Sequence, residues 1–96
     1  MDPADRAPGA PDCLRQSPDV VSRRLDRAGV LVHLPSNRIF ELNETGIRLW
    51  ELIRDEGDTS RIVNRLAEEF DVDVERANRE VRDLLHWFQQ EGLVGS

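Results

Sequence analysis

The residues that could carry out acid–base or nucleophilic chemistry are few and scattered in this chain. Its two histidines, His33 and His86, fall on a predicted strand and a predicted helix, and neither forms a recognisable triad with a serine or cysteine. Cys13 is the single cysteine, so it can form no intramolecular disulfide, and a lone thiol in a proline-rich segment is usually inert. We therefore expect structural roles for both histidines and no enzyme activity.

Signatures of metals, cofactors and membranes are also missing from the sequence. The histidines and carboxylates are not clustered at metal-ligand spacing, and the glycines do not form a phosphate-binding loop. No apolar run approaches the roughly 18–20 residues that a membrane span needs. Residues 1–12 lack the basic and apolar regions of a signal peptide. We expect no metal, no cofactor, no membrane association and a cytoplasmic location.

The charge balance argues against a nucleic-acid partner. The 96 residues include 19 acidic and 13 basic side chains, a formal net charge of −6, and nucleic-acid phosphates repel such a surface. Arg76, Arg79 and Arg82 recur along the last predicted helix, which is the helix that reads DNA in a winged-helix protein. Carboxylates are interleaved with them, whereas a DNA-reading helix would present its arginines alone. A winged-helix DNA-binding regulator remains an alternative.

The pattern along the chain indicates a tail followed by one small domain. Residues 1–18 contain four of the five prolines and little that is apolar, which predicts a disordered tail. Residues 19–96 are predicted to form the domain. Three β-prone runs begin it, at residues 20–25, 30–34 and 39–42, and the tight turns between them require an antiparallel meander.

Three helices are predicted to follow the meander. Asn43, either Asp58 or Thr59, and Asp73 are good N-cap residues, and apolar residues recur at helical spacing after each. Residues 93–94 are predicted to fold back as a hydrophobic contact at the end of the chain. The fold class is therefore α+β and winged-helix-like, a three-stranded antiparallel sheet followed by three helices. The three apolar stripes are Ile47, Leu49, Trp50 and Ile53; Ile62, Val63, Leu66, Ala67 and Phe70; and Val74, Ala77, Val81, Leu84, Leu85 and Phe88.

The third predicted strand and the third predicted helix together offer a surface for a partner. The last strand of a meander is an edge, whose unpaired N–H and C=O groups can accept an extended peptide. Leu85 and, further round the helix, Trp87 widen the apolar face beyond a single core stripe. A cleft between strand and helix would suit a peptide strand. Alternatively, these residues complete the core, or the free edge pairs with itself in a homodimer.

The run NRIFELNETGIRLWELI at residues 37–53 resembles the PqqD-like family. Its hallmarks are an aromatic residue in the third strand, then Leu-Asn, and Ile/Leu-Trp in the first helix. Residues 59–70 and 81–94 fit the same family, so the resemblance covers about residues 20–94. Stand-alone proteins from lasso-peptide or radical-SAM peptide clusters look closer than the pyrroloquinoline-quinone proteins, which tend to carry Pro-Glu where this chain has Ser36 after Pro35.

The resemblance implies a recognition element for ribosomally made, modified peptides rather than an enzyme. In the family, the leader of a precursor peptide adds as a strand to the third strand and packs on the third helix. The domain then presents the precursor to a modifying enzyme, namely a radical SAM enzyme, a leader peptidase or a cyclase. Carried onto this sequence, the resemblance implies a peptide-binding site made of Arg38, Ile39, Phe40, Glu41, Leu42, Asn78, Val81, Arg82 and Leu85.

Overall fold

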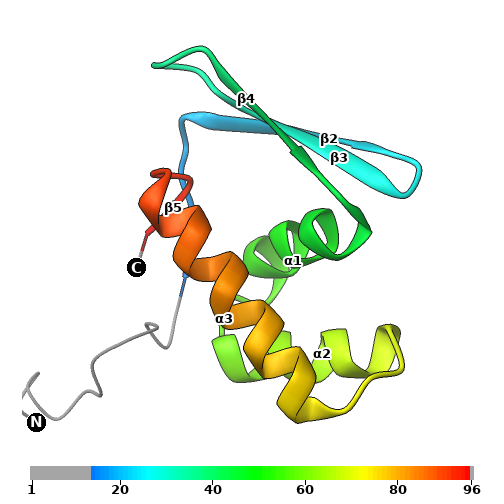
Figure 1. Cartoon of the computed structure of the whole chain (residues 1–96). Coiled ribbons are helices and arrows are strands. Elements are labelled where there is room, and N and C mark those ends of the chain that lie inside the picture. Colours follow the sequence, from blue (N-terminus) through cyan, green and yellow to red (C-terminus); the bar gives the residue numbers. More distant parts are fainter. Residues whose placement is uncertain (1–13, 96) are drawn as a thin grey trace, which may run out of the picture.

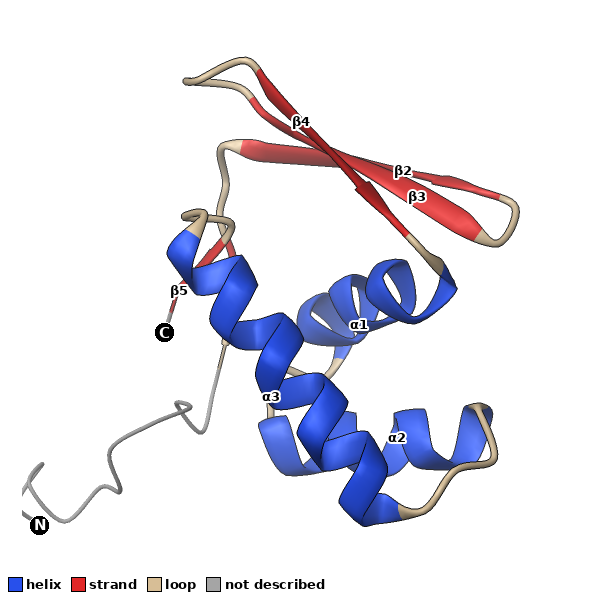
Figure 2. Ribbon diagram, viewed as in Figure 1, coloured by secondary structure: helices blue, strands red, loops and turns tan. Residues whose placement is uncertain are grey.

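A three-stranded antiparallel sheet lies beside three helices in the computed structural model, which describes residues 14–95 (Figures 1 and 2). The strands are β2 (Val20–Leu25), β3 (Ala28–His33) and β4 (Arg38–Leu42), in the spatial order β2-β3-β4. Within residues 14–95, β4 pairs with β3 and with no other strand. The predicted α+β class, the meander and the edge position of β4 are confirmed.

The turns of the sheet depend on residues that tolerate a left-handed backbone. Asp26 lies between β2 and β3, and Asn37 between β3 and β4, with φ of 58° and 59°. Asn and Asp are enriched in this region because their short polar side chains can bond locally. The resulting register places Val32 opposite both Val21 and Ile39. These three side chains lie in one row across the outer face of the sheet.

Each helix begins at a side-chain cap that the sequence predicted. Asn43, Asp58 and Asp73 accept hydrogen bonds from backbone N–H groups in the first turn of their helices. Asp58, and not Thr59, is the cap of the second helix. In the described part of the chain, no helix has the length and apolar character needed to span a membrane. The helices are α1 (Glu44–Asp55), α2 (Thr59–Glu69) and α3 (Val74–Gln90).

The core lies between the inner face of the sheet and the apolar stripes of the helices. Trp50 of α1 meets Phe88 of α3 edge to face, with ring centroids 5.8 Å apart, and both side chains are buried. Gly29 of β3 lies directly over Ile47 of α1, where a Cβ would collide with the isoleucine side chain. Glycine therefore lets α1 approach the sheet closely.

The start of the described chain corrects one boundary. The tail was predicted to reach residue 18, but Leu14 is buried, and β1 (Arg15–Gln16) pairs antiparallel with β5 (Val94–Gly95). Gln16 Nε2 also donates to the carbonyl oxygen of Trp50 at 2.7 Å. Residues 14–18 thus belong to the domain, and the predicted fold-back of residues 93–94 is confirmed as part of this small sheet. The rest of the predicted tail, with Cys13, lies outside the described residues.

Candidate functional site

The free edge of β4 exposes the backbone groups of Ile39 and Glu41. Asp19 and Leu34 lie opposite each other just beyond the end of the β2–β3 ladder. The N–H of Leu34 donates to the carbonyl of Asp19 at 2.9 Å, so these two residues form a hydrogen-bonded pair. Hydrogen-bonded pairs recur at every second residue of an antiparallel ladder, so the even-numbered residues of β3 bond to β2. The backbone groups of the odd-numbered residues of β3 point the other way and bond to β4. Their partners in register are Arg38, Phe40 and Leu42. The N–H and C=O groups of Ile39 and Glu41 therefore point away from the sheet.

The side chains of β4 alternate between the core and the outer face. Phe40 and Leu42 are 8% and 6% exposed and point inward, whereas Ile39 is 67% exposed on the outer face. Arg38 shares the inner side, and its guanidinium carbon lies 4.9 Å from the centroid of the Phe40 ring. A peptide strand added to this edge would place its own side chains alternately toward α3 and toward Ile39 and Glu41.

Two side-chain contacts bring one flank of α3 beside β4. The rings of Phe40 and Trp87 meet edge to face with centroids 5.5 Å apart. One turn further along, Arg38 Nη1 lies 2.6 Å from Glu91 Oε1. Leu84 is partly buried on the same flank, one turn before Trp87. Helical spacing of three or four residues thus aligns a stripe of α3 along the edge strand.

A hollow of about 260 Å³ continues this flank toward the start of α1. Its walls come from the first residues of α1 and from the middle of α3, next to the point where β4 ends. We call the free edge of β4 together with this flank of α3 the β4–α3 surface. The residues lining the hollow are Asn43, Thr45, Glu80, Asp83 and Leu84.

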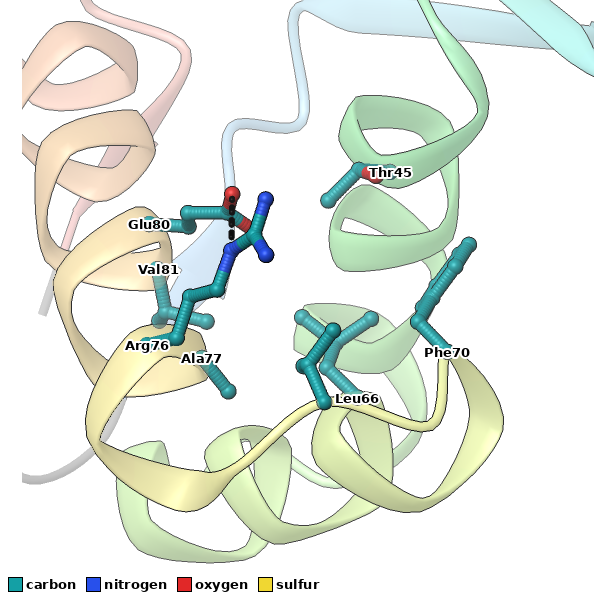
Figure 3. A pocket seen from close by; sticks show the side chains of 8 residues that line it. Thr45, Leu66, Phe70, Arg76, Ala77, Glu80 and Val81 are labelled. Atoms are coloured by element: carbon teal, nitrogen blue, oxygen red, sulfur yellow. Dashed lines mark ion pairs between the residues drawn. The ribbon is translucent and has the colours of Figure 1, made fainter.

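An apolar pocket of about 220 Å³ adjoins the hollow (Figure 3). Thr45 and Glu80 line both. Figure 3 shows Leu66 of α2 and Phe70, the residue after this helix, on one wall and Ala77 of α3 on another. The pocket therefore lies where the three helices meet, at the N-terminal end of α3.

The structure brings together only part of the predicted site. Residues 38–42 form β4 as expected, but Val81 and Leu85 are 0% and 1% exposed and belong to the core. Arg82 and Asn78 lie together on the other flank of α3, where Arg82 Nε donates to Asn78 Oδ1 at 3.3 Å. The family resemblance implied these four residues of α3, but the apolar stripe of this helix has two flanks, and either one could face the strand. Leu84 and Trp87 lie three residues apart, and this spacing was a signal for the flank that lies beside β4. The sequence pattern alone gave no reason to prefer this flank over the one that carries Asn78 and Arg82.

The two histidines lie on different elements, His33 in β3 and His86 in α3. His33 Nδ1 lies 2.7 Å from Ser36 Oγ in the turn before β4, and His86 is exposed on α3. Across residues 14–95, no three histidine, cysteine or acidic side chains are grouped so that they could hold a metal ion. The β4–α3 surface offers a partner backbone hydrogen bonds, apolar contacts and carboxylates at its rim.

Comparison with known proteins places this geometry in a family. Residues 28–94 match the family model described as coenzyme PQQ synthesis protein D (PqqD). The solved structure of TbiB1 in complex with the TbiA(beta) leader peptide superposes with a TM-score of 0.80 at 30% sequence identity, covering 85% of this chain and 95% of that one. No curated protein matches the chain.

A second solved structure shares the fold. Lasso peptide synthetase B1 complexed with the leader peptide has a TM-score of 0.76 at 20% identity, covering 86% of this chain and 98% of that one. The family model spans β3 to β5, and therefore includes β4, all three helices and both sides of the β4–α3 surface. The chain belongs to the PqqD family.

Proposed function

We propose that this protein binds the leader segment of a ribosomally synthesised precursor peptide and presents the precursor to a modifying enzyme. The observation that carries the proposal is the free edge of β4 beside α3, in a chain 30% identical to a protein solved with a leader peptide. The leader would add as a fourth strand to the sheet. Main-chain pairing with Ile39 and Glu41 would give affinity that depends little on leader sequence, and pockets for alternate side chains would give specificity.

The peptide contacts on the strand are those predicted from the sequence, Arg38 to Leu42. On α3, we assign the contacts to Leu84 and Trp87 rather than to Asn78 and Arg82. Trp87 already touches Phe40 of the edge strand, and Leu84 lines the hollow beside it. Val81 and Leu85 support this flank from the core.

The small size of the interface determines how the protein would present the precursor to its enzyme. A leader that is disordered in solution must be ordered on binding, so part of its contact energy is lost and the affinity should be modest. Holding the leader raises the effective concentration of the attached core peptide at the enzyme. The partner enzyme would be a radical SAM enzyme, a leader peptidase or a cyclase. A precursor made on ribosomes is available in the cytoplasm, which is where we place the protein.

The test is an NMR titration of the full isotope-labelled chain with the TbiA(beta) leader peptide and with leaders of short precursors encoded beside its gene. We expect shift changes in β4 and at Leu84 and Trp87. We also expect the amide protons of Ile39 and Glu41 to exchange more slowly, because both acquire a hydrogen bond. A bound leader that leaves these two amides exchanging freely would overturn strand addition.

The same samples address the alternative of a homodimer. Slow exchange at Ile39 and Glu41 in the free protein, appearing only at high protein concentration, would indicate that β4 pairs with itself. Sedimentation of the free protein as a monomer, with the two amides unprotected, would leave the edge available to the leader.

A further inference from the structure

The outer face of the three-stranded sheet is apolar, and Figure 2 shows the three helices on the opposite side of the sheet. Val20 packs against the core and Arg24 pairs with Glu51 of α1, so the odd-numbered residues of β2 point outward. Val21 and Ile39 lie in one row on this face and are 49% and 67% exposed. A contiguous exposed apolar patch on a small domain marks an interaction surface.

The neighbouring row of the same face carries one charge of each sign. The register aligns Arg23 of β2, Val30 of β3 and Glu41 of β4. The two charged residues are two strand spacings apart, which is about 10 Å. Within residues 14–95, neither side chain has an ion-pair partner. The outer face is therefore electrically balanced, in a chain whose formal net charge is −6.

These two rows are complementary to a second copy of themselves. Two sheets that stack face to face keep their strands within about 30° of each other. A two-fold axis running along β3, between two such sheets, places β2 of one copy over β4 of the other and keeps each row over itself. Arg23 then faces Glu41 of the second copy, and Val21 faces Ile39 of the second copy. An axis across the strands would place β2 over β2, which forms neither pair.

We propose that the outer face of the sheet packs against the same face of a second copy, as a two-fold sandwich of two sheets. The face is three strands wide and about six residues long, so it measures about 14 Å by 20 Å. This is smaller than the roughly 800 Å² that each partner buries in a standard interface. We therefore expect a weak dimer, with a dissociation constant of about 10–100 μM.

Such a dimer leaves the β4–α3 surface of each copy open. Because β4 of one copy lies over β2 of the other, the two free β4 edges lie at opposite borders of the sandwich. The contact uses outward side chains, so the backbone groups of Ile39 and Glu41 stay unpaired. The helices lie on the outer sides of the two sheets. Dimer formation and leader binding are therefore compatible, and neither requires the other.

Sedimentation equilibrium of the full chain, from about 5 to 500 μM, measures the association. NMR of side-chain methyl groups over the same range locates it. We expect concentration-dependent shifts at Val21, Val32 and Ile39, while the amide proton of Ile39 continues to exchange fast. A protein that stays monomeric throughout this range would overturn the proposal. So would shifts confined to other surfaces, or an Ile39 amide that becomes protected.

Charge reversal tests the two-fold pairing itself. Arg23→Glu and Glu41→Arg each bring like charges opposite one another at both contacts, so at low ionic strength each variant alone should self-associate about tenfold more weakly. An equimolar mixture of the two variants restores opposite charges at both contacts and should associate about as tightly as the parent protein. Mixing cannot repair a folding defect in either chain, so recovery reports the pairing alone.

The matched control is Arg61→Glu, which makes the same charge change at an exposed position of α2. It should leave the association close to that of the parent. Equal weakening by Arg61→Glu and Arg23→Glu, or a mixture that stays dissociated, would overturn the two-fold pairing. Arg23 lies on β2, away from the β4–α3 surface, so Arg23→Glu should bind a leader as the parent does. Loss of leader binding in the parent protein would overturn the proposed function and leave the dimer standing.

Discussion

At the residue scale, a chain of ion pairs joins the sheet to the first two helices. Arg24 of β2 pairs with Glu51 of α1, and the distance from Arg24 Nε to Glu51 Oε2 is 2.8 Å. Arg48 of α1 pairs with Glu69 of α2, and the distance from Arg48 Nε to Glu69 Oε1 is 2.6 Å. Hydrogen bonding from the Arg24 guanidinium holds the pKa of Glu51 below its ordinary value. Hydrogen bonding from Arg48 lowers the pKa of Glu69 in the same way.

These shifts predict a loss of stability in acid. The folded protein binds protons to Glu51 and Glu69 less readily than the unfolded chain does, so the two carboxylates stabilise the fold above the ordinary glutamate pKa of about 4.3. This contribution is lost as the pH falls through their lower folded-state pKa values. We expect Glu51→Gln to reduce the denaturation midpoint near neutral pH and to flatten its fall in acid.

The matched control is Glu68→Gln, which changes an exposed carboxylate of α2 outside these pairs. Urea denaturation of the parent and both variants, from neutral pH down into acid, measures how the denaturation midpoint of each protein changes with pH. If Glu51→Gln and Glu68→Gln gave parallel curves, the ion pair with Arg24 would make no contribution to the fold.

At the element scale, the proposed function depends on one edge strand and one flank of one helix. The free backbone groups of β4 belong to Ile39 and Glu41, because alternate residues are committed to β3. The other free edge of the sheet is β2, where the same alternation leaves the N–H of Ser22 unpaired by β3. The two edges therefore allow a controlled test of strand addition.

Proline at position 39 should weaken leader binding without breaking the sheet. Ile39→Pro removes an outward N–H that β3 does not use, so the loss is about one hydrogen bond, a two- to tenfold weaker affinity, or about 0.5–1.5 kcal/mol. Ser22→Pro makes the equivalent change at the β2 edge and should leave the affinity unchanged. Calorimetric titration with a leader that binds the parent measures both, after circular dichroism has shown that they fold.

The flank of α3 can be tested in the same titration. Leu84 lines the hollow beside β4, whereas Arg82 lies on the other flank. We expect Leu84→Ala to weaken leader binding about tenfold, since it removes apolar contact, and Arg82→Ala to change it little. The reverse order of effects would move the leader to the flank that carries Asn78.

At the scale of the whole molecule, the two ends of the described chain close the domain. Leu14 is 2% exposed, and its N–H donates to the carbonyl of Gly57 at 2.8 Å. β1 and β5 then pair beside the end of α3, as Figure 1 shows. This contact holds α3 from its C-terminal end, close to the Arg38–Glu91 pair that joins it to β4.

Removing the Leu14 side chain should therefore destabilise the whole domain. Leu14→Ala leaves a cavity in the core, and such substitutions reduce the free energy of unfolding by about 2–5 kcal/mol. Arg15→Ala, at the exposed neighbouring position, is the control. Urea denaturation followed by tryptophan fluorescence measures both, and equal small effects would show that the Leu14 side chain contributes nothing to the core.

The sequence by itself determined the order of the three-stranded meander and the three helices, and most of their boundaries. Asn43 and Asp73 cap helices through contacts with their own next turn, and a meander leaves its last strand at an edge. Apolar spacing also identified which face of α3 is buried. These features were predictable because each depends on residues that are neighbours in the chain, within one turn or one hairpin.

Only the tertiary structure decided which flank of α3 lies beside β4, that Leu14 is part of the core, and that a pocket opens beneath Arg76. An apolar stripe has two flanks, and the way α3 packs against the other elements selects the one that carries Trp87. A single leucine in a proline-rich segment has no periodicity, and Leu14 is buried where its backbone bonds to Gly57 and where the next two residues pair with Val94–Gly95. These features require contacts between distant residues, which local patterns do not contain.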